Sequence, residues 1–562
     1  MSTILVQSPS SAQLRALQCV DILFDILDRL APYGQCTSLE ERRSVLAFAG
    51  TSKLFYALAF KVLWARLPCL LPLLFLLPEV DRLYHAGRAR KGDFDTSIQI
   101  TVSEAPGGEV LSQIRSRAAC LQVLGEDISG AAHKCWKEPI INDAGWSYLL
   151  RLFGDEPGLF PSLERLAWHP TPSCDDLRLL SAPSLLQVEL RDHRYAHGSQ
   201  FHEGDMQPEW QQPLASALRQ MLMRAPSLSS LTLNVATNNN VLAMTPRDRL
   251  VQLRDLALIE EELRNCATFR DDYPTAACLR LISTLPLLKL TLDFNMQLSS
   301  LLRLDLPNGF HTLEDLCIFD YNTCAAPFLQ LHCSAPALQT LSVIFAWDMP
   351  RGHAIVLTTT IAQRFPALTA LCLMLPAAWE PFETMFAPLL TLPRLSQVTL
   401  HLEQCSGEHS LSDAYLMQCA EAWSDLRYLE IYYDLYSENQ VPATVTLDAL
   451  ISLATQCLKL QTLLLPHLYV EDYTASNNIV LPRIGHRLRV LAITVVDIAD
   501  EARDMICAIT IARLFPNVDI AMSLKKDAEV ARCCSLYRIF SGPRASTAIK
   551  WKDMLARMEK CR

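Results

Sequence analysis

Leucine and other aliphatic residues recur along most of the chain in a short template, Leu-x-x-(Leu/Val)-x-aliphatic. Alternating apolar positions over such a short run are typical of a strand with one buried face. Copies begin at Leu163, Leu185, Leu228, Leu253, Leu287, Leu313, Leu338, Leu368, Leu395, Leu426, Leu460 and Leu488, with a weaker one at Val518. Several copies follow a proline by two residues, at Pro161, Pro183, Pro226, Pro336, Pro366, Pro393 and Pro516. Prolines confined to one register indicate a turn that leads into each strand.

The segments between these strands are long enough for a helix, because successive copies lie 22 to 43 residues apart. Helical spacing of apolar residues occurs at 214–224, 356–364, 414–423, 447–456 and 502–514. Such a strand–helix unit is typical of leucine-rich repeats and buries its strand face only by stacking on its neighbours. We therefore predict an α/β solenoid over residues 161–522, with parallel strands on the concave face and helices on the convex face. Only Asn295 supplies the polar residue usual beyond each strand, so irregular turns are expected.

A second pattern, in residues 17–67, predicts a module of three short helices. The first has apolar residues at helical spacing and ends near Pro32 and Gly34, which break helices. The second and third are predicted at 39–50 and 52–67, and the third is apolar on most sides. Three helices in about 50 residues bury only a small core. Part of this apolar surface therefore needs a partner or the following repeats.

The residues of this module resemble an F-box. The matching steps, in the family's order, are Asp21-Ile22-Leu23, Ile26-Leu27, Leu54-Phe55 and Leu63-Trp64-Ala65-Arg66-Leu67. Cys19 stands where the family has a proline, and the segment 31–43 is longer than usual. With repeat sequences such as Leu-Phe-Pro-Ser-Leu-Glu-Arg-Leu (159–166), the whole chain resembles F-box/leucine-rich-repeat proteins of mushroom-forming fungi.

The resemblance implies a non-catalytic substrate-recognition subunit of a Skp–cullin–F-box type ubiquitin ligase. Its N-terminal helices would dock a Skp-family adaptor, and through it a cullin–RING ligase, while its repeats bind a protein target. The residues implied at the adaptor interface are Leu17, Ile22, Leu23, Ile26, Leu27, Leu54 and Trp64. Two alternatives stay open: residues 17–67 are an ordinary helical cap, or the chain is a leucine-rich-repeat interaction scaffold not linked to ubiquitination.

The remaining segments are predicted as a disordered N-terminus (1–16), a linker and entry to the repeats (68–160) and a basic C-terminal helical cap (523–562). The apolar stretch 67–77 is too short to span a membrane, so we expect it to pack on the first repeat, with membrane contact as the alternative. The cap holds 10 Lys or Arg against 4 Asp or Glu. We expect Ile549, Met554, Leu555 and Met558 to pack inward; a localisation patch or partner site is the alternative.

Composition disfavours several other functions. A formal net charge of −10 disfavours nonspecific nucleic-acid binding. The 19 scattered cysteines form no Cys-x-x-Cys pair, and no catalytic motif occurs, so we predict no metal, no cofactor and no enzyme activity. The acidic pairs Asp175-Asp176 and Asp271-Asp272 are expected to be solvated loop charges. Reduced thiols and the lack of a signal peptide favour the cytoplasm or nucleus.

The target site is predicted on the concave strand face. In the repeat that begins at Leu426, alternation places Tyr428, Glu430 and Tyr432 on the face away from Leu429 and Ile431. Tyrosines are frequent interface anchors, which favours these three residues as target contacts. The alternative is that they pack only against neighbouring strands. The polar stretch 191–213, predicted as a loop, is the other candidate target site.

Overall fold

The structure is a computed structural model of the 562-residue chain. It describes residues 19, 23, 39–77, 80, 106–125, 143–153, 158–171, 173–191, 211–234, 242, 245–259, 274–306, 309–345, 349–376, 380–405, 411–435, 445–470, 486–498, 501–533, 548–549 and 551–561. The chain divides into two compact units, Met1–Leu253 and Arg254–Arg562. We call them the first and second units.

The first unit begins with a small helical module. Helices α3 (Leu39–Ala49) and α4 (Lys53–Ala65) pack against each other and match the predicted helices at 39–50 and 52–67. Ser52 caps α4, since its Oγ accepts a hydrogen bond from the Phe55 amide at 3.1 Å. The predicted first helix lies outside the described residues except for Cys19 and Leu23.

Parallel strands follow the module in chain order within the first unit. They are β1 (Arg66–Leu67), β2 (Val123–Leu124), β3 (Arg165–Trp168), β4 (Gln187–Arg191) and β5 (Ser230–Asn234). The helices are α5 (Leu71–Leu74), α7 (Gly108–Ala118), α8 (Asp143–Phe153), α9 (Asp175–Leu180), α10 (Gln211–Arg224) and α12 (Arg247–Leu250). Paired strands thus begin ahead of residue 161, within the segments predicted as module and linker. The predicted loop 191–213 is wrong at its two ends, because Arg191 ends β4 and residues 211–213 begin α10, and the residues between them lie outside the described ones.

The second unit repeats the strand–helix period from β6 to β14. Its strands are β6 (Asp255–Ile259), β7 (Lys289–Phe294), β8 (Asp315–Asp320), β9 (Thr340–Phe345), β10 (Ala370–Leu375), β11 (Gln397–Cys405), β12 (Tyr428–Leu435), β13 (Thr462–Val470) and β14 (Val490–Ile498). All pair in parallel with their neighbours in chain order. This sheet with helices confirms the predicted α/β fold of the leucine-rich-repeat type.

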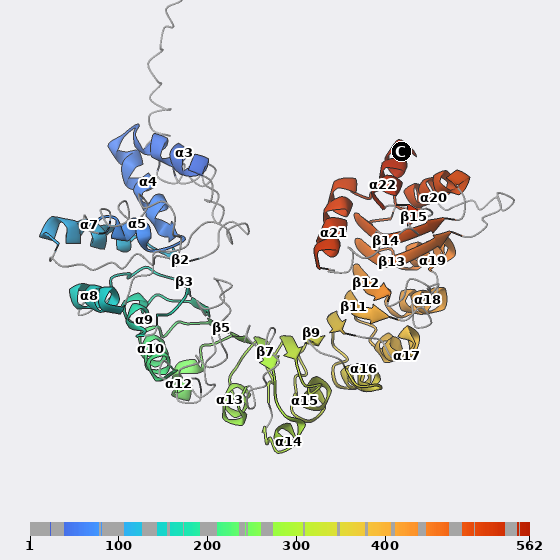
Figure 1. Cartoon of the computed structure of the whole chain (residues 1–562), viewed down its shortest axis with the longest axis horizontal. Coiled ribbons are helices and arrows are strands. Elements are labelled where there is room, and N and C mark those ends of the chain that lie inside the picture. Colours follow the sequence, from blue (N-terminus) through green and yellow to red (C-terminus); the bar gives the residue numbers. More distant parts are fainter. Residues whose placement is uncertain are drawn as a thin grey trace, which may run out of the picture. The chain divides into compact units, whose positions relative to one another are not determined.

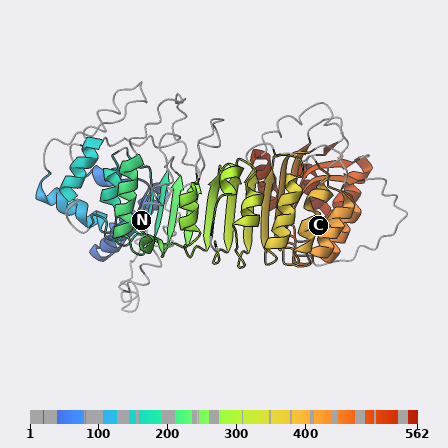
Figure 2. The ribbon, with the colours of Figure 1, turned by 90° about the horizontal axis from the view of Figure 1, so that it is seen from below.

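Helices and short turns connect these strands along one side of the sheet (Figures 1 and 2). They are α13 (Ala276–Ile282), α14 (Leu298–Leu301), α15 (Ala325–Leu331), α16 (His353–Arg364), α17 (Phe382–Phe386), η5 (Ala387–Thr391), α18 (Asp413–Ala422), α19 (Leu447–Gln456) and α20 (Glu501–Leu514). The helices predicted from apolar spacing correspond to α10, α16, α18, α19 and α20. We call the opposite side of the strands, which none of these connecting helices covers, the helix-free face.

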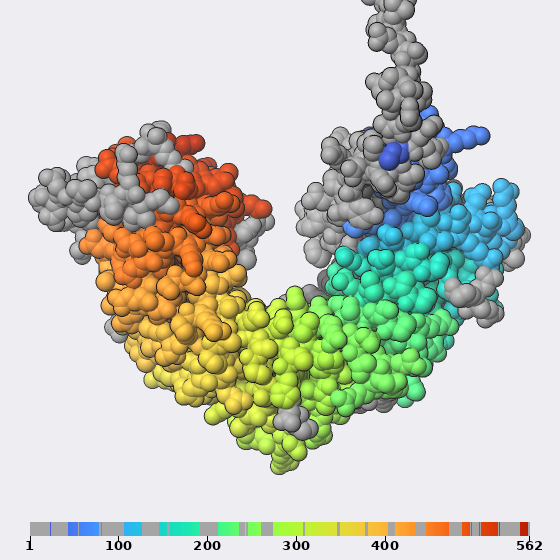
Figure 3. Space-filling view, turned by 180° about the vertical axis from the view of Figure 1, so that it is seen from behind, coloured from blue at the N-terminus to red at the C-terminus, as the bar shows by residue number. Residues whose placement is uncertain are grey.

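The template leucines form the core between strands and helices. Each strand from β3 to β14 begins two residues after the first template position, and Leu313, Leu316 and Ile318 are typical in being fully buried. Side chains of successive repeats in the second unit form an unbroken packed body (Figure 3). Asn295, the one polar residue expected beyond a strand, is buried and accepts a hydrogen bond from Asn322 Nδ2 at 2.5 Å. Stacking therefore buries each strand face, as the period predicts.

The weak thirteenth template at Val518 is wrong as a strand prediction. The chain enters this repeat like the others, since the Asp519 amide donates to the Arg489 carbonyl at 2.7 Å. It then forms helix α21 (Ile520–Cys533) instead of a strand. The Asp519 carboxylate accepts the Met522 amide at 2.9 Å, which caps the first turn of that helix. Ala521 and Ser523 stand at the inner template positions, so a strand here would bury little apolar surface.

The C-terminal segment covers the outer edge of β14. Strand β15 (Ala548–Ile549) pairs antiparallel with it, and helix α22 (Trp551–Cys561) packs on α20 and β14. Both backbone polar groups of Leu491 find partners here. Its amide donates to Ser523 Oγ at 3.2 Å, and its carbonyl accepts from Trp551 Nε1 at 3.0 Å. Met554, Leu555 and Met558 are fully buried, whereas the Ile549 side chain lies outside the described ones.

Candidate functional site

The helix-free face of the second unit presents three rows of side chains, set by strand register. The first row is Asp255, Lys289, Asp315, Thr340, Ala370, Gln397, Tyr428, Thr462 and Val490. Two residues further along the strands, the second row is Ala257, Thr291, Cys317, Ser342, Cys372, Thr399, Glu430, Leu464 and Ala492. The third row includes Asp293, Phe319, Ile344, Met374, His401 and Tyr432. The middle of the second row is therefore small, and most of the third row is large.

Tyr428, Glu430 and Tyr432 lie on this face, whereas Leu429 and Ile431 are fully buried on the other. Tyr428 and Glu430 are partly exposed, and the Tyr428 hydroxyl donates a hydrogen bond to the Glu430 carboxylate. Burial, followed by the carboxylate of Glu430, raises the pKa of Tyr428 to about 12. Tyr432 is only 3% exposed, and its ring meets that of His401 at a centroid distance of 4.8 Å. Tyr432 therefore offers little surface to a partner.

Helix α21 shares this face with the three residues. It lies on the side of β12–β14 opposite α18 and α19 (Figure 1) and packs on β14. Lys526 Nζ is 3.3 Å from Glu430 Oε2 and 5.9 Å from the centre of the Tyr428 ring. Tyr432, Leu464 and Ala492 form a small buried apolar cluster on the same strands. Two of the three predicted target contacts, Tyr428 and Glu430, are thus engaged by Lys526 of the chain's own helix α21.

The N-terminal module has a small core and an exposed apolar surface. Leu23, Val45, Ala49, Leu58 and Ala59 are buried together, with Phe48 stacked on Phe55 at 4.5 Å beside them. Leu46 of α3 and Tyr56 of α4 are instead 56% and 57% exposed. Neither residue belongs to the set predicted at the adaptor interface. A helical-wheel position alone does not reveal them, because their exposure depends on how α3 and α4 pack.

The residues predicted at the adaptor interface fall in different places. Leu23 belongs to the module core, and Trp64 packs on Phe60 and lies 5.0 Å beneath the Arg117 guanidinium of α7. Trp64 therefore joins α4 to the rest of the first unit. Leu54 lies in α4, although its side chain is outside the described ones. The other four, Leu17, Ile22, Ile26 and Leu27, lie outside the described residues.

Two buried carboxylates organise turns after strands. Asp176, expected as a solvated loop charge, is fully buried, so that prediction is wrong. Its carboxylate accepts hydrogen bonds from Trp168 Nε1 at 2.7 Å and from the Thr171 and Leu177 amides at 2.9 Å. Asp320 is also buried and accepts the Ala325 amide at 2.6 Å, at the start of α15. Asp175 is largely buried too and bonds to Ser147 and Arg178, whereas Asp271 and Asp272 lie outside the described residues.

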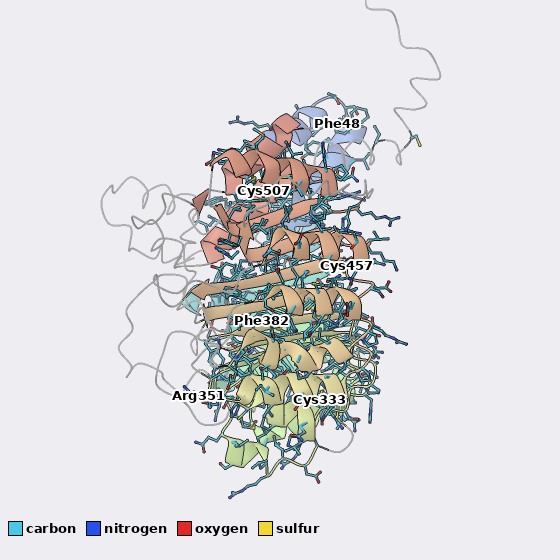
Figure 4. All side chains as sticks on the ribbon, turned by 90° about the vertical axis from the view of Figure 1, so that its right-hand side faces the viewer. Phe48, Cys333, Arg351, Phe382, Cys457 and Cys507 are labelled. Atoms are coloured by element: carbon cyan, nitrogen blue, oxygen red, sulfur yellow. The ribbon has the colours of Figure 1, made fainter. Side chains whose placement is uncertain are left out.

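Buried thiols line the helix layer of the second unit. Cys333, Cys457 and Cys507 come from the ends of α15 and α19 and from α20 (Figure 4). Burial raises the pKa of Cys278 and Cys333 to about 12. The described residues contain no group of three or more His, Cys, Asp or Glu side chains placed to hold a metal ion. Among the described helices, none combines the length and apolar composition needed to cross a membrane.

Cys278 and Cys333 are expected to stay unmodified when the folded chain meets iodoacetamide at pH 8. A thiol whose pKa is about 12 holds a negligible thiolate fraction at that pH, and burial blocks the reagent as well. Peptide mapping by mass spectrometry should find both thiols modified only in denaturant. Rapid modification of either thiol without denaturant would contradict the packing of α13 and α15.

Comparison of the sequence with family models and with curated proteins finds no match. Among solved structures, the chain is similar to an internalin (inlF) from Listeria monocytogenes str. 4b F2365. The two are 13% identical, and the match covers 81% of this chain and 97% of the internalin with a TM-score of 0.32. At that TM-score the likeness adds nothing to the strands and helices already described. The structure by itself has a fold of the leucine-rich-repeat type, in which the helix-free face and the N-terminal module are the candidate interaction surfaces.

Proposed function

We propose that this chain is a substrate-recognition subunit of a Skp–cullin–F-box type ubiquitin ligase. Its module of α3 and α4 docks a Skp-family adaptor, and its helix-free strand face binds a protein target. The observation that carries the proposal is the exposure of Leu46 and Tyr56 on a small helical module that has F-box-like residues and precedes the repeats. Large apolar side chains left exposed on a module with so small a core are available to a partner.

The residues of the module divide into contacts and supports in this proposal. Leu46 and Tyr56 meet the adaptor directly, and so do Leu17, Ile22, Ile26 and Leu27. Leu23 supports the surface from the core, and Trp64 fixes α4 against α7 through Arg117. The chain itself performs no covalent step. It holds a target close to the ubiquitin-loaded enzyme, which raises the effective concentration of the target at that enzyme.

Replacing Leu46 and Tyr56 together by aspartate is expected to weaken adaptor binding about 100-fold. Each change removes an apolar anchor worth about 1–2 kcal/mol and buries a charge in its place. Because both side chains are exposed, the fold should be retained, as circular dichroism can verify. The measurement is titration of the purified chain with a Skp-family adaptor.

The matched control is Leu331→Asp, which charges an equally exposed leucine at the end of α15 in the second unit. This variant should bind the adaptor normally. Unchanged adaptor binding by the double variant would contradict the docking surface. If the unmodified chain binds no adaptor but still captures a target, the interaction scaffold without ubiquitination becomes the better proposal.

A further inference from the structure

The helix-free face carries an apolar row that α21 does not occupy. Phe319, Ile344, Met374 and His401 lie side by side on β8–β11, one from each strand, and all are partly exposed. Beside them, the second row offers only Cys317, Ser342, Cys372 and Thr399, which are small. We call these four large residues, three of them apolar and the fourth a histidine, the apolar row. The same register position in β12 is Tyr432, where the buried cluster near α21 begins.

We infer that the apolar row binds an amphipathic α-helix of the target protein, laid across β8–β11 with aliphatic side chains on the row and a lysine or arginine toward Asp315. This inference rests on the target-binding half of the proposed function and is independent of the adaptor half. It names the kind of segment that a target must present.

The position of α21 on the helix-free face shows how this face binds a helix. Its Ser523 bonds to Leu491 of β14, while Lys526, one turn later, reaches Glu430 of β12. The helix therefore crosses strands instead of running along them. It also places Lys526 against Glu430, which is an acid of the second row. A partner helix on β8–β11 would continue the same arrangement along the same face.

Repeat distances favour a helix over an extended peptide. Adjacent strands are about 4.8 Å apart, so the four residues of the apolar row span about 14 Å. A helix brings a side chain to the same face about every 5.4 Å and drifts by about 2 Å over that span. Same-side residues of an extended peptide are about 6.8 Å apart, and over the row the mismatch grows to about 6 Å, which exceeds a strand spacing. Only the helix can place one side chain at each strand.

An acid on the same strand as Phe319 favours a basic helix. Asp315 is partly exposed in the first row of β8, four residues before Phe319. Burial raises the pKa of Asp315. The charge of Lys289 lowers this pKa, and the charge of Asp255 raises it further. A cationic side chain from a partner would offset the desolvation of this carboxylate, as Lys526 of α21 meets Glu430 four strands along the face.

The test uses a synthetic 18-residue peptide of leucine, lysine and alanine, with leucines at helical i, i+4, i+7 and i+11 spacing. We expect it to bind the full-length chain, by fluorescence anisotropy, with a dissociation constant in the micromolar range. Ile344→Asp and Met374→Asp should each weaken binding at least tenfold, and Asp315→Asn severalfold. Val356→Asp, on the exposed side of α16, should have no effect.

Three comparison peptides identify other occupants. A scrambled peptide of the same composition and a version with central prolines should bind at least tenfold more weakly, because neither forms the apolar helix face. A version with glutamate in place of lysine should also bind more weakly. Equal binding of the scrambled or proline peptide, or full binding by Ile344→Asp, would overturn the inference. Adaptor binding of the same variants should remain normal, so a failure here is distinct from a failure of the docking proposal.

Discussion

Replacing Trp551 by alanine is expected to lower the free energy of unfolding of the second unit by about 3–5 kcal/mol, the usual cost of truncating a buried aromatic side chain. Trp551, the first residue of α22, is 2% exposed, and α22 packs on β14. Its loss leaves a cavity at the end of the array and removes the donor to the Leu491 carbonyl. Urea unfolding followed by circular dichroism measures the change.

The matched variant Trp551→Phe separates packing from hydrogen bonding. Phenylalanine fills most of the space but cannot donate to Leu491, so its cost should be smaller, about 1–2 kcal/mol. Hydrogen exchange should show faster exchange of the backbone amides of β14 in the alanine variant than in the phenylalanine variant. If Trp551→Ala leaves both stability and exchange unchanged, the C-terminal segment does not hold the edge of β14.

The second large effect concerns pH. Burial raises the pKa of Asp320 from its ordinary 3.8 to about 6, against the opposing effect of the amides that bond to it. The folded state therefore keeps this proton at pH values where the unfolded state has lost it. The resulting stability is fully present below pH 3.8 and is lost as the pH rises through about 6, a total of about 3 kcal/mol.

Asp320→Asn removes this titration, so the two proteins should differ in the shape of their pH profiles. Between pH 4.5 and 7.5, the free energy of unfolding of the unmodified chain should fall by about 2 kcal/mol relative to the variant. Glu421→Gln, which removes an exposed carboxylate of α18 and keeps Asp320, serves as the control. The difference in free energy of unfolding between this variant and the unmodified chain should stay constant over the same pH range. Parallel profiles for Asp320→Asn and the unmodified chain would contradict the buried, titrating carboxylate.

Local patterns predicted the strands because the information is local. A leucine template with a preceding proline specifies both the turn and the buried face, and every strand from β3 to β14 starts at the predicted register. The failure at Val518 has a local cause as well. Asp519 caps a helix there, and the inner positions Ala521 and Ser523 give a strand little to bury. The lack of large apolar residues at those two positions was the signal in the sequence that no strand forms there.

The candidate sites were predicted less completely, because they depend on contacts between distant segments. Alternation places Tyr428 and Glu430 on the helix-free face, but no local pattern reveals that Lys526 of α21 meets them there. The burial of Asp176 depends in the same way on Trp168 and Thr171 folding around it. Leu46 and Tyr56 needed the packing of α3 on α4 before their exposure was visible.

The occupied edge of β14 restricts where further repeats can be added to this array. A new repeat added after β14 would need the amide and carbonyl of Leu491 for its own strand, but Ser523 and Trp551 already hold both groups. Duplication at this end would therefore first have to displace two helices and a strand. Insertion of a repeat between existing ones leaves the closing segment intact, so evolutionary lengthening of this unit is expected at internal positions. The same closure denies neighbouring molecules this strand edge for end-to-end polymerisation.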